Sequence, residues 1–140
     1  MRDDNCIFCK IAAGEIPSRT VYEDNDFRVI LDLGPASKGH ALILPKDHVA
    51  NLMELDDEVA AKVLPVAKKV GRAMMKSLGC AGLNMIQNNG EEAGQTVMHF
   101  HVHMIPRYAG ANELSLWKPG TASAEEMDAA AKMISEAIEA

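Results

Sequence analysis

Three features are missing from this 140-residue chain, and each absence narrows its class. No long hydrophobic run is present: stretches such as Ala41–Leu44 fall far short of the roughly 18 apolar residues that cross a bilayer, so no membrane partner is expected. No apolar stretch follows the polar and acidic first five residues, so we expect no signal peptide and a cytoplasmic location. No internal repeat or low-complexity tract interrupts the chain, which predicts one domain.

An excess of positive charge is also missing. The chain has 14 Lys and Arg against 20 Asp and Glu, a net charge of −6, so it would be repelled by a phosphate backbone and no nucleic-acid partner is expected. A small anion can still bind, because such binding depends on the hydrogen-bond donors at one site and not on the net charge of the whole chain. Only three cysteines are present, Cys6, Cys9 and Cys80, and without a secretory context they do not predict a disulfide framework.

Extended patterns recur along the first three quarters of the chain. They lie in four segments, namely residues 20–32, 40–45, 84–88 and 96–107. The first contains a polar turn at 24–26 and reads as a hairpin, and the last two are joined by a Gly-containing loop. The sequence therefore predicts five strands, paired antiparallel.

Helical patterns fill two other segments. Residues 56–78 have apolar positions at three- and four-residue spacing and end at a glycine, and Pro65 is expected to kink or divide this helix. Ser123 and Glu126 predict a capping box that opens a C-terminal helix. One stripe of that helix is apolar, with Met127, Ala130, Ala131, Ile134 and Ile138. The fold class expected is α+β, an antiparallel five-stranded sheet with helices packed on one face.

The most informative stretch is residues 99–105, where His99, His101 and His103 alternate with apolar residues. Five randomly placed histidines would give this spacing with a probability of roughly 0.003. Residues two apart in a strand share a face, so the three rings should project together. Unpartnered imidazoles are costly in a core, so this face should meet water, a metal or a ligand. A polar sheet face and a zinc site with an open fourth position are the alternatives.

The loop before this strand has the composition of an anion site. Gly90 and Gly94 allow main-chain N–H groups to approach an anion closely, and Thr96 adds a hydroxyl donor just before the histidines. We interpret the segment as a phosphate cradle beside a nucleophile. A hairpin loop rich in turn residues is the alternative interpretation.

These segments together resemble the histidine triad (HIT) family, whose signature is three histidines alternating with apolar residues and followed by two more apolar positions. The resemblance covers about residues 5–108, so residues 1–140 should form a single HIT-like domain in which 109–140 is a tail and C-terminal helix outside the resemblance. It implies binding of a nucleoside phosphate, with a purine base, and cleavage at the α-phosphorus through a nucleotidyl-histidine intermediate. The substrate would be a nucleoside phosphoramidate or a dinucleoside polyphosphate, and no cofactor would serve catalysis.

The resemblance also implies catalytic roles. His101 would be the nucleophile, His103 would contact the phosphate, Thr96 would lie near the bridging atom, and His40 would match the upstream histidine of the site. The chemistry is coherent in itself, because a neutral imidazole is nucleophilic when one nitrogen is free and the other donates its proton in a hydrogen bond. We expect His101 to donate that bond to a main-chain carbonyl.

Nucleotide contacts follow from the same resemblance. Asp32 would accept hydrogen bonds from both ribose hydroxyls, and Asn88 would lie on the opposing wall. The main chain of residues 95–97 would hold the phosphoryl oxygens, with Gln95, Thr96 and Val97 as contacts. An apolar slot around the base would be formed by Ile7, Phe8, Ile11, Leu31 and Leu33.

Cys6 and Cys9 have the spacing of half a zinc site, and zinc needs four ligands. His48 and His99 would complete the set, an order of ligands that some HIT-like proteins use. A structural zinc is therefore the interpretation we prefer. Free buried thiols and a redox pair are the alternatives, although a redox pair is expected at a helix N-terminus after a strand.

Two further hypotheses compete with the nucleotidyl-histidine enzyme. One is a zinc hydrolase in which His99, His101 and His103 are all metal ligands, and the other is a nucleotide-binding module without turnover. The resemblance further implies a homodimer joined through a helix and a sheet edge. Trp117, in the tail, either caps an edge of the core or reaches a neighbouring subunit.

Overall fold

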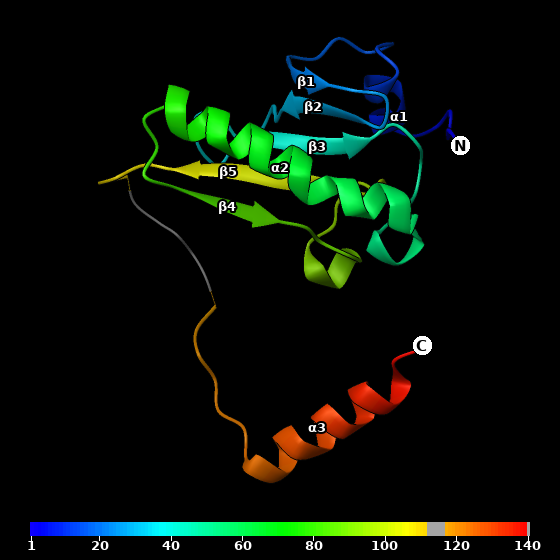
Figure 1. Cartoon of the computed structure of the whole chain (residues 1–140), viewed down its shortest axis with the longest axis vertical. Helices are drawn as coiled ribbons and strands as arrows, with labels where there is room; N and C mark the ends of the chain where they lie inside the picture. The colour runs from blue at the N-terminus through cyan, green and yellow to red at the C-terminus, as the bar shows by residue number, and fades with distance from the viewer. Residues whose placement is uncertain (112–116, 140) are drawn as a thin grey trace.

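The computed structural model describes residues 1–111 and 117–139. Its centre is a five-stranded antiparallel sheet in the order β1-β2-β3-β5-β4 (Figure 1). The strands are β1 (Thr20–Glu23), β2 (Phe27–Leu31), β3 (Ala41–Pro45), β4 (Gly82–Ile86) and β5 (Val102–Arg107). The predicted α+β class and five-stranded antiparallel sheet are confirmed.

Local chemistry explains the first hairpin. Asp24 Oδ1 accepts the main-chain N–H groups of Asp26 and Phe27, each at 2.8 Å, which turns the chain between β1 and β2. β3 is buried at all five positions because both faces of this central strand are covered: Ala41 and Ile43 pack in one core cluster, and Leu42 and Leu44 pack in a second cluster on the other face.

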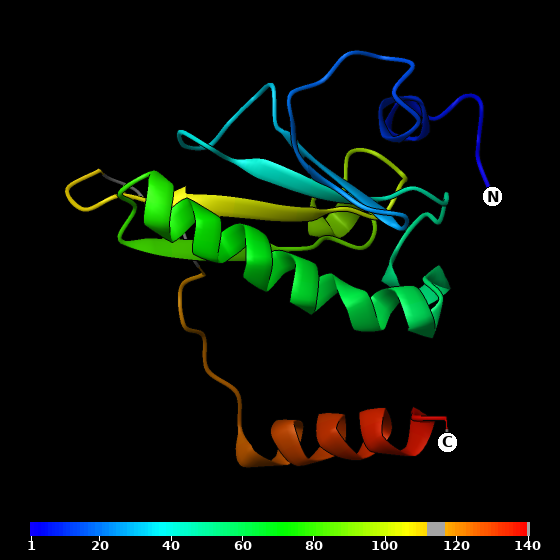
Figure 2. The same cartoon turned by 45° about the horizontal axis from the view of Figure 1, so that its top comes forward.

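The two faces of the sheet are covered by different helices. α2 (Asp57–Ser77) packs on one face over the main core, which includes Phe27, Val29 and Ile43. α1 (Ile7–Ala12), which the sequence analysis did not predict, packs on the opposite face (Figure 2). The expected packing of helices on one face therefore holds for α2. In contrast, α1 packs the N-terminal segment against β3 on the other face of the sheet.

Pro65 does not divide α2, which runs unbroken through 21 residues. The missing N–H of a proline normally weakens the turn that precedes it. Here Pro65 is exposed, so the carbonyl that loses its partner can be solvated by water. The prediction that Pro65 splits this helix is wrong because the residue lies on the solvent side.

The segment that carries the histidines is a strand only in its second half. β5 begins at Val102, so His99 and His101 precede the strand rather than lying within it, as the prediction of a strand over 96–107 had placed them. The alternation of faces nevertheless continues upstream, because Phe100 donates its main-chain N–H to Val49 O at 2.7 Å and packs in the α2-side core.

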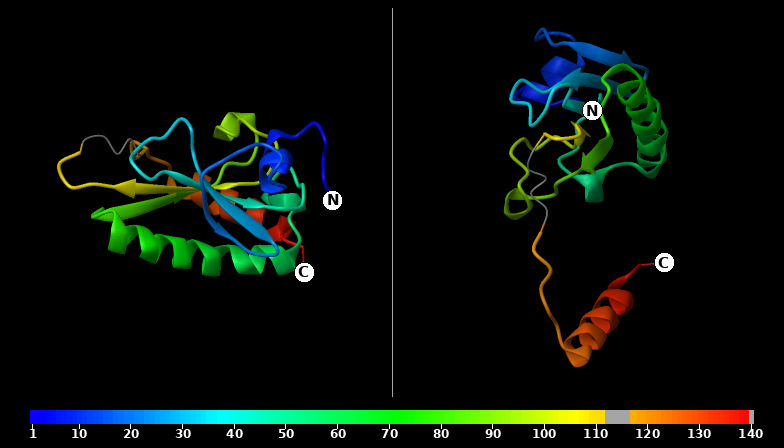
Figure 3. Two further views of the ribbon diagram at one scale, coloured as in Figure 1. Left: turned by 90° about the horizontal axis from the view of Figure 1, so that it is seen from above. Right: turned by 90° about the vertical axis from the view of Figure 1, so that its left-hand side faces the viewer.

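The chain ends in an arm that leaves the domain. α3 (Ala124–Ala137) begins with the predicted capping box, in which Ser123 and Glu126 satisfy each other's main-chain N–H groups. No residue of α3 is buried, and the helix lies beyond the β4 edge, apart from α2 and the sheet (Figure 3). Residues 112–116 and 140 of the predicted tail fall outside the described residues. Over the described ranges, no helix is both long and apolar enough to cross a membrane.

Candidate functional site

The three histidines of the motif lie on the face of the sheet that α1 covers. His99 is fully buried, His101 is 6% exposed and His103 is half-buried. The His101 ring packs edge-on against Phe8 of α1 and against His103, each with centroids 5.0 Å apart. The missed helix α1 therefore supports the central imidazole.

His101 has a defined tautomer. Its Nδ1 lies 2.7 Å from the His99 carbonyl oxygen. A carbonyl can only accept, so Nδ1 carries the proton and Nε2 keeps a free lone pair. The hydrogen bond to a main-chain carbonyl that the sequence analysis predicted is present, and it leaves the ring ready for nucleophilic attack.

His40 and His103 form a second hydrogen-bonded unit. Ala36 donates its main-chain N–H to His40 Nδ1 at 2.9 Å, which fixes the His40 proton on Nε2. That Nε2 lies 2.9 Å from His103 Nδ1 and 3.5 Å from Asp32 Oδ2. His40 therefore donates to His103, whose own proton must then be on its outer nitrogen, Nε2. Nothing in the sequence pointed to Ala36, because its contribution is a main-chain group.

The environment keeps both of these rings neutral. Burial lowers the pKa of His103 to about 4, the nearby rings of His101 and His40 act in the same direction, and Asp32 opposes them. Burial also lowers the pKa of His40; Asp32 raises it and Arg107 lowers it. At neutral pH the relay from Ala36 through His40 to His103 therefore operates between uncharged imidazoles.

The glycine loop closes on itself through Gln95. Gly94 adopts the left-handed conformation with φ of 94°, which only glycine adopts without strain. Gln95 donates its main-chain N–H to Gly90 O at 3.0 Å, and its side-chain amide donates to Ala50 O and Val97 O at 2.6 and 3.0 Å. The Gln95 main-chain N–H, which we expected to hold a phosphoryl oxygen, is therefore already paired within the loop.

Thr96 and Val97 are the donors that remain. Their main-chain N–H groups make no hydrogen bond to any described residue, and the Thr96 side chain is exposed. Both residues line a pocket of about 470 Å³ together with Ile7 of α1. Three residues that the resemblance assigned to the nucleotide thus meet at one opening.

The predicted ribose and wall residues lie at the ends of two different strands. Asp32 follows β2, and its Oδ1 accepts the Gly34 N–H at 2.8 Å while the other oxygen faces His40. Leu33 is 88% exposed. Asn88 follows β4, and its side chain lies against Gly94 of the loop.

The predicted apolar slot is only partly assembled. Phe8 is buried and Ile11 packs beside it in the α1-side core, while Ile7 is half exposed on the same helix. Leu31 is wrong as a member of the slot, because its side chain packs on the α2 side of the sheet. The period of two in β2 sends Leu31 to the face opposite Ile30.

The predicted zinc ligands converge. The ligand atoms of Cys6, Cys9, His48 and His99 all lie within 4.8 Å of one another. His99 Nδ1 is 3.4 and 3.5 Å from the two sulfurs, and His48 Nδ1 is 3.3 Å from Cys9 Sγ. A tetrahedral zinc with bonds of about 2.3 Å to sulfur and 2.0 Å to nitrogen would hold S and N about 3.5 Å apart. The four side chains fit such an ion.

The protonation of His99 also suits a metal. His99 Nε2 donates to Pro45 O at 2.8 Å, so Nδ1 presents its lone pair to the thiols. Burial lowers the pKa of His99 to about 4, which keeps the ring neutral as a ligand must be. Burial raises the pKa of the Cys9 thiol, so a metal would have to displace the proton of this thiol when it binds. The Pro45 carbonyl, like the Ala36 N–H, is a main-chain contribution that sequence analysis could not assign.

The alternative with three histidines on one ion does not match this geometry. Both ring nitrogens of His99 are committed, one to the thiols and one to Pro45, and His101 Nδ1 is committed to a carbonyl. Among the described residues, His103 instead groups with Asp32 and His40. His99 and His103 therefore belong to two separate clusters, with His101 between them.

Comparisons with known proteins identify the family. A family model described as a HIT domain matches residues 13–110. The adenosine 5'-monophosphoramidase hnt1 of Schizosaccharomyces pombe is 42% identical over 135 residues, which cover 96% of this chain and 98% of that protein. A HIT family crystal structure from Bacillus subtilis matches with TM-score 0.91 and 39% identity, covering 98% of this chain and 99% of that chain. A zinc-bound histidine triad family protein from Mycobacterium smegmatis matches with TM-score 0.75 and 34% identity, covering 96% and 98%. This chain is a member of the HIT family.

Proposed function

We propose that this protein is a nucleotidyl hydrolase or transferase that cleaves a purine nucleoside phosphoramidate at the α-phosphorus, with His101 as nucleophile. The observation that carries the proposal is the 2.7 Å bond from His101 Nδ1 to the His99 carbonyl, which frees Nε2. The printed name of the S. pombe relative, a monophosphoramidase, supports the substrate class. Dinucleoside polyphosphates are the second substrate class to test, because the same attack would cleave them.

In the first step His101 Nε2 forms a bond to phosphorus, and the bond from phosphorus to the leaving nitrogen breaks with its electron pair. The leaving nitrogen takes one proton, which comes from solvent by way of His103 Nε2. His40 supports this direction of transfer because it donates to His103 Nδ1 and so keeps the outer nitrogen protonated. A positioned proton donor of this kind contributes typically 10²- to 10⁴-fold.

In the second step a water molecule attacks the phosphorus, the bond to His101 breaks, and one proton returns to solvent. Thr96 and Val97 would donate main-chain N–H groups to the phosphoryl oxygens in both steps. Each such donor is worth about 2.7 to 4 kcal/mol in comparable oxyanion sites. An alcohol or phosphate in place of water would make the same intermediate serve a transferase.

The nucleoside would bind beside this centre. Asp32 would accept the ribose hydroxyls through the oxygens that now face Gly34 and His40. The base would pack over the exposed apolar side chains of Ile7 and Leu33, with Phe8 and Ile11 beneath them. Asn88 would close the opposite wall.

A structural zinc completes the proposal. Cys6, Cys9, His48 and His99 would hold it, and the ion would tie α1 to the segment before β5. The M. smegmatis relative that carries zinc supports this reading, as does the fit of the four ligand atoms. Catalysis itself would need no cofactor, because His101 and His103 lie outside the ligand set.

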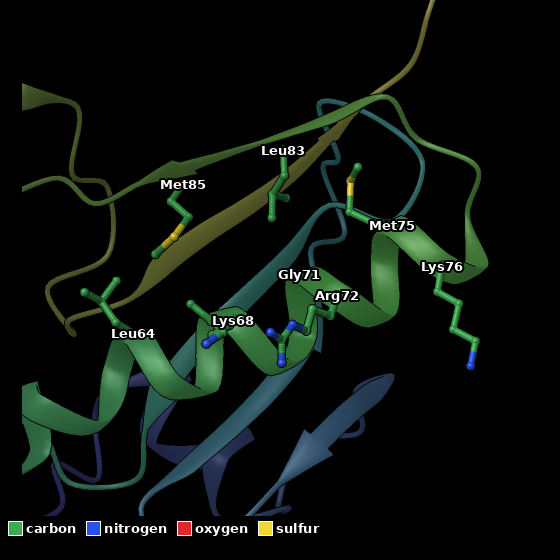
Figure 4. A pocket seen from close by; sticks show the side chains of 9 residues that line it. Leu64, Lys68, Gly71, Arg72, Met75, Lys76, Leu83 and Met85 are labelled. Carbon is green, nitrogen blue, oxygen red and sulfur yellow. The ribbon is translucent and has the colours of Figure 1, made fainter.

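We further propose a homodimer formed through α2 and β4. β4 is an edge strand, which presents unpaired main-chain groups. The groove beside it, about 690 Å³, is lined by Leu83 and Met85 of β4 and by Leu64 and Met75 of α2, whose side chains face a common space (Figure 4). Exposed apolar surface next to an open sheet edge favours an interface between copies.

The decisive experiment incubates the protein with an adenosine phosphoramidate of a simple amine, with and without a chelator. Product AMP and the intact mass of the protein after acid-free quenching are both measured. We expect chelator-resistant turnover and an adduct of one nucleotidyl group that is lost in His101→Ala. Parallel assays use a dinucleoside polyphosphate.

Other outcomes would overturn particular parts. Activity that disappears with the metal would favour the zinc hydrolase over attack by His101. Tight binding of nucleotides without turnover of either substrate would favour a binding module. Turnover of the polyphosphate alone would keep the mechanism and change the substrate.

A further inference from the structure

The glycine loop between β4 and β5 is held at both ends by the short segment that precedes α2. At the start of the loop, Asn89 Oδ1 accepts the main-chain N–H of Leu52 at 2.8 Å. At its end, the Gln95 side chain donates to Ala50 O at 2.6 Å. Gln95 Oε1 also accepts the Gly90 N–H at 2.8 Å, which joins the two ends to each other. The position of the loop therefore depends on residues outside it.

The same segment is also bound to the stretch that carries the proposed nucleophile. Val49 O accepts the main-chain N–H of Phe100, the residue before His101, at 2.7 Å. Residues 49–52, which we call the anchoring segment, thus hold both the histidine motif and the loop with its main-chain donors. Reacting groups must be placed closely, because a displacement of about 1 Å can slow a reaction by about 100-fold. The anchoring segment is therefore in a position to set the distance between nucleophile and phosphate.

Asn89 makes the contact between this segment and the start of the loop, and its side chain is held in one orientation. A main-chain N–H can only donate, so the Asn89 atom that faces Leu52 is the oxygen. The amide nitrogen then faces Gln87, and the two side chains exchange hydrogen bonds of 2.8 and 2.9 Å. Gln87 also donates to Asn88 O at 3.1 Å. Asn89 is thus fixed from two sides, by the end of β4 and by the anchoring segment.

These hydrogen bonds contribute more to position than to stability. The bond from Leu52 is exposed to solvent and the amide pair is half-buried, so water can replace each partner at small cost. Asn89 Oδ1 already accepts two hydrogen bonds, so it has no capacity left for a ligand. Asn89 is therefore placed to act through the loop rather than by contact with a substrate.

We propose that Asn89 is a positioning residue of the reaction, which holds the start of the glycine loop to Leu52. Through this anchor the main-chain N–H groups of Thr96 and Val97 stay aligned with the attacking nitrogen of His101. The inference rests on the function proposed above, and it adds to that function a residue that contacts neither the phosphate nor the ribose. Loss of the anchor should lower kcat, which depends on alignment at the phosphorus, and leave KM, which depends on the ribose and base contacts, nearly unchanged.

The test compares the steady-state kinetics of full-length variants on an adenosine phosphoramidate of a simple amine. Asn89→Ala leaves the Leu52 N–H without its acceptor, and we expect kcat to fall by about 20-fold with KM within about threefold of the wild type. Asn89→Asp keeps an oxygen for Leu52, so its kcat should lie within about threefold of the wild type. Asn25→Ala, which changes an exposed asparagine in the β1-β2 turn, is the control and should alter neither constant.

Gln87→Ala provides a second route to the same result if Asn89→Ala folds poorly. This variant releases Asn89 from the β4 side and keeps its bond to Leu52. We expect kcat to fall by about fivefold, because the anchor is loosened and not removed. A kcat equal to that of the wild type would contradict the role of the amide pair.

A sulfur substitution separates positioning from a general loosening of the loop. Sulfur accepts hydrogen bonds weakly, so replacing a phosphoryl oxygen by sulfur should slow the reaction in the diastereomer whose sulfur faces the loop donors. The ratio of the single-turnover rates with oxygen and with sulfur should be at least threefold smaller in Asn89→Ala than in the wild type. A residue that served the fold alone would lower the melting temperature and leave this ratio unchanged.

The outcomes distinguish this inference from the proposed function. Equal kcat in Asn89→Ala and the wild type would overturn the inference and keep the function. A higher KM with unchanged kcat would also overturn it, because Asn89 would then serve binding. A wild type that turns over neither the phosphoramidate nor the polyphosphate would remove the proposed function and this inference with it.

Discussion

His99 and His103 lie only four residues apart, yet they serve two different clusters. His99 faces two thiols and the ring nitrogen of His48, a set suited to a metal, whereas His103 faces His40 and Asp32, a set suited to proton transfer. Burial lowers the pKa of both rings to about 4, so neutrality does not distinguish them.

The difference lies in which ring nitrogen the protein fixes from outside. Pro45 O accepts a hydrogen bond from the His99 Nε2–H group, which leaves the Nδ1 lone pair free for a cation. Ala36 donates its N–H to His40 Nδ1, so His40 donates from Nε2 to His103 Nδ1. This leaves the proton of His103 on Nε2, where it can be donated. The main-chain groups that contact each ring thus set one histidine up as the proposed metal ligand and the other as the proposed proton donor. Substitutions in the two clusters should therefore have separable effects.

The largest effect should come from the residue between the clusters. His101→Ala removes the proposed nucleophile, so we expect turnover of the phosphoramidate to fall by about 10⁴-fold or more, as for other lost nucleophiles. Zinc content should stay unchanged, because no ligand is altered. Steady-state kinetics and metal analysis on the same preparation measure both; residual activity above one per cent would contradict a covalent role.

Cys9→Ser tests the metal side alone. We expect zinc content to fall from about one ion per chain to near zero. The free energy of unfolding should fall by about 2 to 3 kcal/mol, and the melting temperature should be roughly 10 °C lower. Turnover per folded chain at 20 °C should change by less than about threefold, because the hydrogen bonds of His103 and His40 are untouched. Calorimetry, metal analysis and kinetics check this, with Cys80→Ser as a control distant from the cluster.

His103→Gln tests the proton side alone. We expect kcat/KM for an alkylamine phosphoramidate to fall by about 10²- to 10³-fold, with zinc content and melting temperature close to wild type. A substrate whose leaving group departs as a stable anion needs no proton, so its loss should be less than about tenfold. Equal losses for both substrates would show that His103 positions the phosphate rather than delivering the proton.

His40→Asn should have a smaller effect of the same kind. The variant removes the ring that donates to His103 Nδ1, so we expect about a tenfold loss of kcat with the alkylamine substrate, because His103 could then adopt either tautomer. Asp32→Asn is the useful comparison, since it should raise KM through the ribose rather than lower kcat. If His40→Asn changes KM alone, the relay is wrong.

The smallest predicted effect is on the pH dependence of stability. The His103 pKa is about 4 when folded and near 6.5 when unfolded. Between these values the unfolded chain binds more protons, so stability contributed by neutral His103 is complete above pH 6.5 and is lost as pH falls toward 4. The slope from one such group is at most about 1.4 kcal/mol per pH unit. Urea titrations at several pH values give the free energy of unfolding of zinc-loaded wild type and His103→Gln. The pH dependences of the two proteins should differ by up to this slope, and identical pH dependences would contradict the prediction.

Sequence patterns were sufficient for the parts governed by local chemistry. The β1-β2 hairpin, the buried β3 and the Ser123 capping box follow from side-chain alternation and short-range hydrogen bonds, and all three are present. The alternation around His101 also predicted correctly that the three rings leave the α2-side core.

What the sequence could not give depends on tertiary context. α1 has only six residues and is anchored by the Cys6 thiol accepting the Cys9 N–H, a signal that the zinc-like spacing masked. The hydrogen bond by which the Gln95 side chain holds the glycine loop needs the carbonyl of Ala50, which is 45 residues away in the sequence. Pro65 is tolerated because of the side on which it lies, and periodicity does not show how an isolated proline is solvated.

The carbonyl of His99 links the two clusters through a single residue. Its ring is anchored toward the thiols while its main-chain oxygen sets the proton on the attacking imidazole. The His99 ring is also held by Pro45 O at 2.8 Å, so a change at the thiols should leave this carbonyl in place, and the metal cluster can be altered while the attacking imidazole keeps its orientation.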